Sequence, residues 1–228
     1  MGFGILFFGY IIMSVFSLNP FGDIAQLIGY SLIFYALLKL SPYTRGFKIA
    51  KYTAVPLALY SLFSSVLTLA SKAGVDISVF DGAKLVLKPI VAVLVFAFHL
   101  FLLWGIRELA KTTELTKIAD KAVRNFVVGA FYFALSVFGM INTPIQEDFA
   151  KYFGLPTLLI GLVWYILNIM LIYSCYMWIC LEGDEDMARK PSRFAFINKL
   201  NDAFDKKEEE AIKSSVEYAN KKKRKKKK

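Results

Sequence analysis

Two residues of this sequence could do chemistry inside an apolar environment, His99 and Asn168. Each lies near the centre of a long apolar run, at residues 85–106 and 156–181. A histidine or a carboxamide in such a run needs a hydrogen-bond partner, so both side chains should face the protein interior and can hydrogen-bond each other. They are the candidate residues for binding a solute or relaying a proton. The alternative is that they only lock two helices together.

No combination of residues indicates catalysis, metal binding or cofactor binding. The chain lacks His-Glu-x-x-His, Gly-x-Ser-x-Gly, a Walker-type lysine loop and Gly-x-Gly-x-x-Gly. The acidic residues Glu147 and Asp148, like those at 184–186, lie in connections where solvation explains them. Cys175 and Cys180 are the only cysteines, and five residues apart they lie on different sides of a helix. We therefore expect a non-enzymatic protein without a cofactor.

The composition predicts an integral membrane protein. Hydrophobic residues make up 57% of the chain and the mean hydropathy is +0.50, whereas soluble domains contain roughly 45 to 50% apolar residues. Charged residues make up 20% and gather in a few segments between the apolar runs. Lipid requires this distribution, because a charge at the bilayer centre costs about 2.5 to 3.5 kcal/mol.

Six apolar runs predict the transmembrane helices. They cover residues 4–18, 24–40, 52–70, 85–106, 126–141 and 156–181. A spanning helix needs about 20 residues, and the third, fourth and sixth runs reach that length without their flanks. With flanking residues included we count about six helices, with five as the alternative. The predicted fold is an all-α polytopic bundle over residues 1–181, followed by a charged cytoplasmic tail over residues 182–228.

Lys and Arg predict the orientation of the bundle. The second connection contains four, the fourth contains five and the tail contains 15, against none, three and one in the first, third and fifth connections. By the positive-inside rule both termini are cytoplasmic. The composition suits a bacterial plasma membrane. For a eukaryotic source, Lys225 and Lys226 resemble a dilysine signal for retrieval to the endoplasmic reticulum.

The tail has two features of its own. Its segment 192–206 places Phe194, Ile197, Leu200 and Phe204 on one helical stripe, which predicts an amphipathic helix on the membrane surface or docked on the protein's own loops. The chain ends in eight basic residues: Lys221, Lys222, Lys223, Arg224, Lys225, Lys226, Lys227 and Lys228. Each is worth about 1 kcal/mol near an anionic membrane surface. The expected partners are the bilayer with its anionic headgroups and another membrane or cytoplasmic protein, with nucleic acid as the less favoured choice.

Other polar residues receive structural interpretations. Ser61 and Ser65 form a pair of small residues four apart in the third run, a spacing that allows close helix packing. Asp23 and Gln26 lie at the outer end of the second run, where we expect them to cap a helix.

Two functions follow. The first is a membrane subunit or scaffold that acts through its basic tail, because the bundle is chemically plain and the tail elaborate. The alternative is a small-solute permease or transport subunit with a cavity near His99 and Asn168. The helix number, length and orientation are similar to those of the substrate-binding membrane subunits of energy-coupling-factor vitamin transporters. This similarity is one of shape and implies no function.

Overall fold

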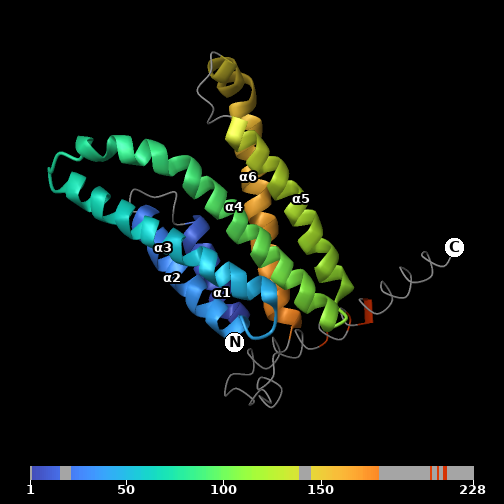
Figure 1. Cartoon of the computed structure of the whole chain (residues 1–228). Helices are drawn as coiled ribbons and strands as arrows, with labels where there is room; N and C mark the ends of the chain where they lie inside the picture. The colour runs from blue at the N-terminus through green and yellow to red at the C-terminus, as the bar shows by residue number, and fades with distance from the viewer. Residues whose placement is uncertain are drawn as a thin grey trace.

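The computed structural model of the chain describes residues 2–15, 22–138, 145–179, 206, 210, 213 and 214. Within these residues the secondary structure is helical and no strand occurs. The helices are α1 (Gly2–Val15), α2 (Gly22–Leu40), α3 (Arg45–Lys72), the 3-10 turn η2 (Ser78–Phe80), α4 (Asp81–Thr112), α5 (Thr116–Phe138) and α6 (Ile145–Trp178). Figure 1 shows them in chain order from blue to orange.

Five of these helices, α2 to α6, contain segments long and apolar enough to cross a membrane, and α1 is a shorter apolar helix of 14 described residues. The prediction of an α-helical membrane bundle is thereby confirmed at the level of the fold class. Six crossings, the orientation and the cytoplasmic tail stay predictions.

The helices extend beyond the apolar runs that predicted them. Helix α3 begins at Arg45, seven residues before the third run, and the Thr44 hydroxyl accepts a hydrogen bond from the Phe47 N–H at 3.3 Å. This bond satisfies one of the free N–H groups in the first turn of the helix. Helices α4 and α5 likewise continue through charged residues up to a short connection at 113–115. An apolar run marks the part of a helix that lipid can cover, whereas backbone hydrogen bonding continues past it.

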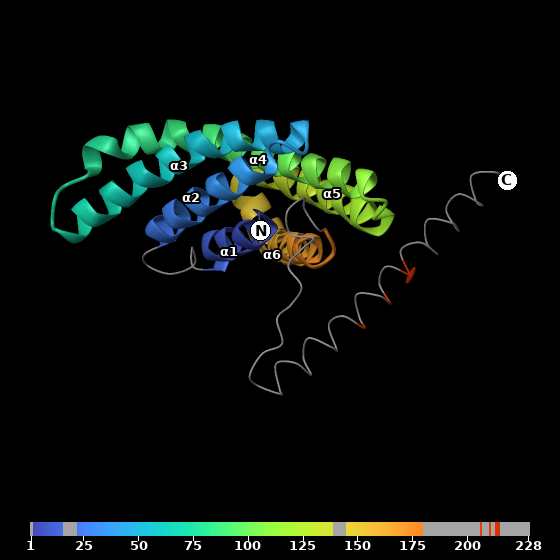
Figure 2. The same ribbon diagram turned by 90° about the horizontal axis from the view of Figure 1, so that it is seen from below.

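The six helices form a closed ring. Each helix packs against the next in sequence, and α6 packs against α1. Seen along the bundle, α3, α4 and α5 make one layer and α2, α1 and α6 the other (Figure 2). The centre of the ring is therefore the place where side chains from distant parts of the sequence can meet.

The two ends of the ring differ in charge and in packing. We call the end where α1 begins the basic end, because nine Lys and Arg lie there: Lys39, Arg45, Lys48, Lys51, Arg107, Lys111, Lys117, Lys121 and Arg124. The half of the bundle next to it, the basic half, contains fully buried side chains such as Leu37, Phe47 and Ile106. At Gly46 a Cβ atom would lie 2.4 Å from the backbone nitrogen of Gly105, so α3 and α4 touch there through their backbones.

The other half, the opposite half, is more open. The hairpin of α3 and α4 points away from α5 and α6 at that end (Figure 1). Large apolar side chains on its outer surface are exposed, including Val66, Val86 and Leu158. The exposed apolar surface suits contact with lipid tails, which do not penalise it.

In the connection between α3 and η2, the Asp76 carboxylate accepts a hydrogen bond from the Ser78 N–H at 2.9 Å, which lowers the pKa of Asp76.

Candidate functional site

His99 lies on α4 with its ring in the centre of the bundle, 1% exposed. Its Nδ1 is 2.7 Å from the carbonyl oxygen of Val95, and its Nε2 is 3.0 Å from the hydroxyl of Tyr10 on α1. A carbonyl can only accept, so Nδ1 donates, and in the neutral ring Nε2 then accepts from Tyr10. The ring also lies 4.6 Å from that of Trp164 on α6. His99 is thus fully hydrogen-bonded as a neutral side chain.

Asn168 on α6 is buried beside a second polar group on α5. Its Oδ1 accepts a hydrogen bond from Asn125 Nδ2 at 3.1 Å, and the same nitrogen donates to the Leu167 carbonyl at 2.8 Å. Trp164 Nε1 in turn donates to the Asn125 carbonyl oxygen at 3.0 Å. These bonds join α5 to α6 in the middle of the bundle. The Asn168 side chain also faces the Tyr10 hydroxyl, and its Nδ2 makes no hydrogen bond within the part of the chain described.

The direct hydrogen bond expected between His99 and Asn168 is not formed. Both ring nitrogens of His99 have other partners, and Tyr10 lies between the two residues. The reason is that α1 closes the ring against α6 and inserts its own polar side chain between α4 and α6. Sequence reasoning missed Tyr10 and Asn125. The sequence contained a signal for both residues. Tyr10 places a hydroxyl in the middle of one apolar run and Asn125 places a carboxamide at the start of another, and each group needs a buried partner.

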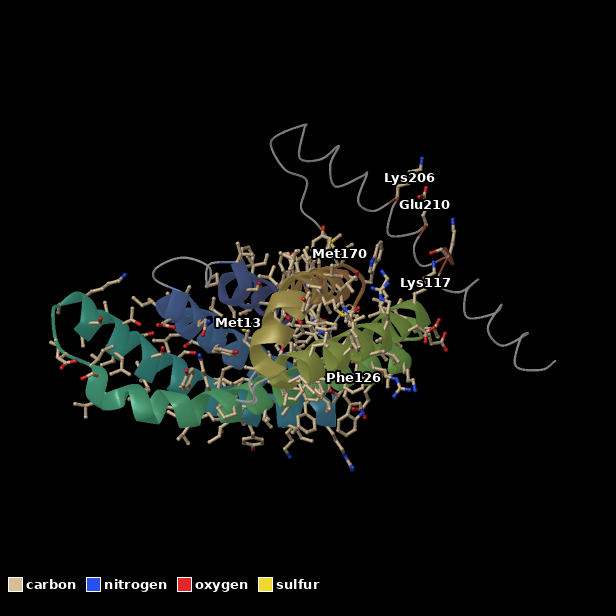
Figure 3. The ribbon with its side chains drawn as sticks, turned by 90° about the horizontal axis from the view of Figure 1, so that it is seen from above. Met13, Lys117, Phe126, Met170, Lys206 and Glu210 are labelled. Carbon is tan, nitrogen blue, oxygen red and sulfur yellow. The ribbon has the colours of Figure 1, made fainter. Side chains whose placement is uncertain are left out.

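An interior pocket lies next to this layer, in the opposite half of the bundle. Its volume is about 200 Å³. Residues of five of the six helices line it: Met13, Gln26, Tyr30, Leu57, Tyr60, Ser61, Val91, Val95 and Tyr165. Met13 is one of the residues labelled in Figure 3. Because only the closed ring of helices brings these residues together, the pocket could not be derived from their spacing in the sequence.

Several polar groups of the pocket have no hydrogen-bond partner among the described residues. Gln26 and the hydroxyls of Tyr30, Tyr60 and Tyr165 make no hydrogen bond to another described residue. Tyr30 is the least exposed of these residues at 6%, whereas Gln26, Tyr60 and Tyr165 are partly exposed. Ser61 differs, because its hydroxyl donates to the Leu57 carbonyl at 2.9 Å. The sequence interpretations of Gln26 as a cap and Ser61 as a packing residue did not foresee that both face a pocket.

The layer of His99 and Tyr10 separates the pocket from the basic half. Val95 lines the pocket and also accepts the hydrogen bond of His99. The Tyr165 ring, a further part of the lining, lies 6.3 Å from both His99 and Tyr10. His99 and Asn168 themselves do not line the pocket. Beyond them the described residues of the basic half are tightly packed, so the pocket is closed toward the basic end.

Among the described residues, phenols are the only ionisable side chains that line the pocket. Bringing a full charge out of water costs several kcal/mol unless a counter-charge compensates it. A cation over a single tyrosine ring gains about 0.5 kcal/mol at an exposed site and about 2 kcal/mol or more when desolvated, which offsets part of that cost but supplies no counter-charge. Asp23, the nearest acid along α2, accepts a hydrogen bond from Thr68 at 2.5 Å and is not part of the lining. The electrostatics therefore favour a neutral occupant.

A larger cavity of about 500 Å³ lies at the basic end. Its charged lining consists of Arg45, Lys48, Lys51 and Glu108, of which Arg45 and Lys48 are exposed. Exposed cations at this end already follow from the positive-inside pattern and require no ligand. The interior pocket, which residues of five helices line and in which four polar side chains have no hydrogen-bond partner among the described residues, is the better candidate for a binding site.

The predicted tail elements lie largely outside the described residues. This holds for the basic residues 221–228 and for the expected amphipathic helix at 192–206, of which only Lys206 is described. One contact of the tail is described: Lys117 Nζ, at the start of α5, donates to Ser214 Oγ at 2.8 Å. Figure 3 shows Lys117 near the labelled tail residues Lys206 and Glu210.

Comparisons with protein-family models, with curated proteins and with solved structures found no match to this chain.

Proposed function

We propose that the protein is a non-enzymatic membrane subunit that binds a small solute in the interior pocket, as a permease or transport subunit would. The observation that carries the proposal is a pocket lined by residues of five helices, in which the side chains of Gln26, Tyr30, Tyr60 and Tyr165 make no hydrogen bond to another described residue. A pocket that combines apolar walls with a few polar groups is typical of a small-molecule site. The pocket lies close to His99, in line with the second of the two functions expected from the sequence.

The packed basic half supports a one-sided site. Access from the basic end is blocked by the layer of His99 and Tyr10 and by the buried residues beyond it. With the basic end cytoplasmic, as the Lys and Arg distribution predicts, the solute would enter from the external side. Passage to the other side would then require the helices of the basic half to move apart.

A thermal-shift screen tests the proposal. The purified protein in detergent is heated in the presence of millimolar amino acids, hexoses, nucleobases or small amides. Ser61→Phe fills the pocket, and Ser31→Phe is the matched control, because Ser31 makes the same hydrogen bond to a carbonyl four residues earlier but lies exposed on α2. We expect at least one solute to raise the melting temperature of the wild type and of Ser31→Phe but not of Ser61→Phe. If no solute raises the melting temperature in this pocket-dependent way, the proposal is wrong.

A scaffold function through the tail is the second candidate, favoured by the hydrogen bond between Lys117 and Ser214. This bond is consistent with a tail that docks on the connection between α4 and α5. Deleting residues 191–228 should then abolish partner binding while leaving solute binding in the pocket intact. Retention of a co-purifying partner by the truncated protein would exclude this function.

A further inference from the structure

We infer that the interior pocket selects an uncharged, single-ring molecule that carries an amide or hydroxyl group. The inference rests on the proposed function, since it names the class of solute for the same pocket. Three properties of the lining lead to it: its aromatic surfaces, its unpartnered polar groups and its lack of charge.

Aromatic rings provide much of the wall. Tyr30, Tyr60 and Tyr165 come from three different helices, α2, α3 and α6. Met13 adds a polarisable thioether, which makes favourable contacts with ring edges. Flat, polarisable surfaces of this kind favour another ring, because offset-stacked and edge-to-face arrangements stabilise aromatic pairs beyond their burial. An aliphatic chain would leave this surface poorly used.

The polar groups of the wall require a ligand that both donates and accepts. Each phenol has one donor and can also accept, and the Gln26 side chain has an oxygen acceptor and two N–H donors. Of the polar lining residues without a hydrogen bond to another described residue, Tyr30 is the least exposed at 6%, so a ligand hydrogen bond to its hydroxyl is the one best shielded from water. A primary amide matches this set, since it donates and accepts at once.

The lack of a counter-charge in the described lining disfavours charged molecules that contain the same aromatic ring. None of the described lining residues is a Lys or Arg that could receive a carboxylate, or an Asp or Glu that could receive an ammonium group. Contact with the rings offsets part of the desolvation of a cation, but a counter-charge would be needed to offset the rest. The volume of about 200 Å³ lies below the roughly 300 to 1,000 Å³ of sites for drug-sized molecules, which limits the ligand to about one ring with its substituents.

Three probes of one shape and different charge test the class: benzamide, benzoate and benzylammonium at neutral pH. Binding to the full-length protein in lipid nanodiscs is measured by saturation-transfer NMR. The pocket-dependent signal is the part of the saturation transfer that disappears in Ser61→Phe but persists in Ser31→Phe. Using only this part excludes signal from probe that has partitioned into the lipid. We expect benzamide to bind the wild type with a dissociation constant in the millimolar range. Its affinity should fall at least tenfold in Ser61→Phe and stay unchanged in Ser31→Phe. The two charged probes should show no pocket-dependent signal.

Two further variants keep the test decisive if Ser61→Phe does not fold. Tyr30→Phe and Gln26→Leu each remove a hydrogen-bonding group without filling the pocket. Each should lower the affinity for benzamide by about three- to tenfold. Pocket-dependent binding of benzoate or benzylammonium at least as tight as that of benzamide would overturn the ligand class while supporting the proposed function. No pocket-dependent binding of any probe would also overturn the class. The solute screen then decides separately on the proposed function.

Discussion

The basic half and the opposite half of the bundle are made by the same six helices and differ in how completely those helices close on each other. In the basic half, glycines let backbones touch and the interior side chains are fully buried. In the opposite half, the α3–α4 hairpin diverges from α5 and α6 (Figure 1), and a polar pocket remains in the ring. The difference suggests that one half provides stability and the other provides the binding site.

The largest expected effect comes from adding a methyl group where two backbones touch. In Gly46→Ala the new Cβ would lie 2.4 Å from the backbone nitrogen of Gly105, so the helices must separate. We expect a loss of about 3 kcal/mol in the free energy of unfolding, measured by titration with sodium dodecyl sulfate in mixed micelles.

Gly154→Ala is the matched control in the opposite half. Nothing lies within 4 Å of a Cβ at this position in α6. Its free energy of unfolding should be unchanged or raised by up to about 1 kcal/mol, because Ala is the better helix former. Equal losses in the two variants would contradict the division of the bundle into a tight half and an open half.

A smaller difference is expected between two buried leucines. Leu37, in the basic half, and Leu57, in the pocket wall, are 0% and 1% exposed. Leu37→Ala should cost about 2 to 5 kcal/mol, because it leaves a sealed void. Leu57→Ala enlarges a space that already exists, and we expect about 1 to 2 kcal/mol, since the cost depends on the cavity left behind. The same titration measures both, and a larger loss for Leu57→Ala would show that the pocket wall is as tightly packed as the core.

The smallest effect concerns the layer between the halves. A double-mutant cycle with Tyr10→Phe and His99→Leu should give a coupling energy of about 0.6 to 1.7 kcal/mol, the range measured for hydrogen bonds inside membranes. The cycle of His99→Leu with Asn168→Leu should give less, because these side chains do not hydrogen-bond each other. A larger coupling energy for His99 with Asn168 than for His99 with Tyr10 would support the direct pairing of His99 with Asn168 that the sequence suggested.

The positions of the helices could be predicted from sequence with errors confined to their ends. The start of α3 at Arg45 was missed because its first turn depends on a cap at Thr44 and not on an apolar residue. Burial of His99 was also predictable, since a lone polar group in an apolar run must avoid lipid. Its partner was not, because Tyr10 is 89 residues away and no spacing rule relates them.

The class of protein was determined by the sequence alone, because lipid imposes local requirements: each spanning segment must be apolar and must satisfy its own backbone hydrogen bonds. Charge placement is equally local, which is why the sequence alone yields a prediction of the orientation. The pocket was decided only by the tertiary structure. Gln26, Ser61 and Tyr165 belong to different helices. Whether they face lipid, a neighbour or a common cavity depends on how each helix is rotated in the ring, and that rotation is set by the packing of all six helices together.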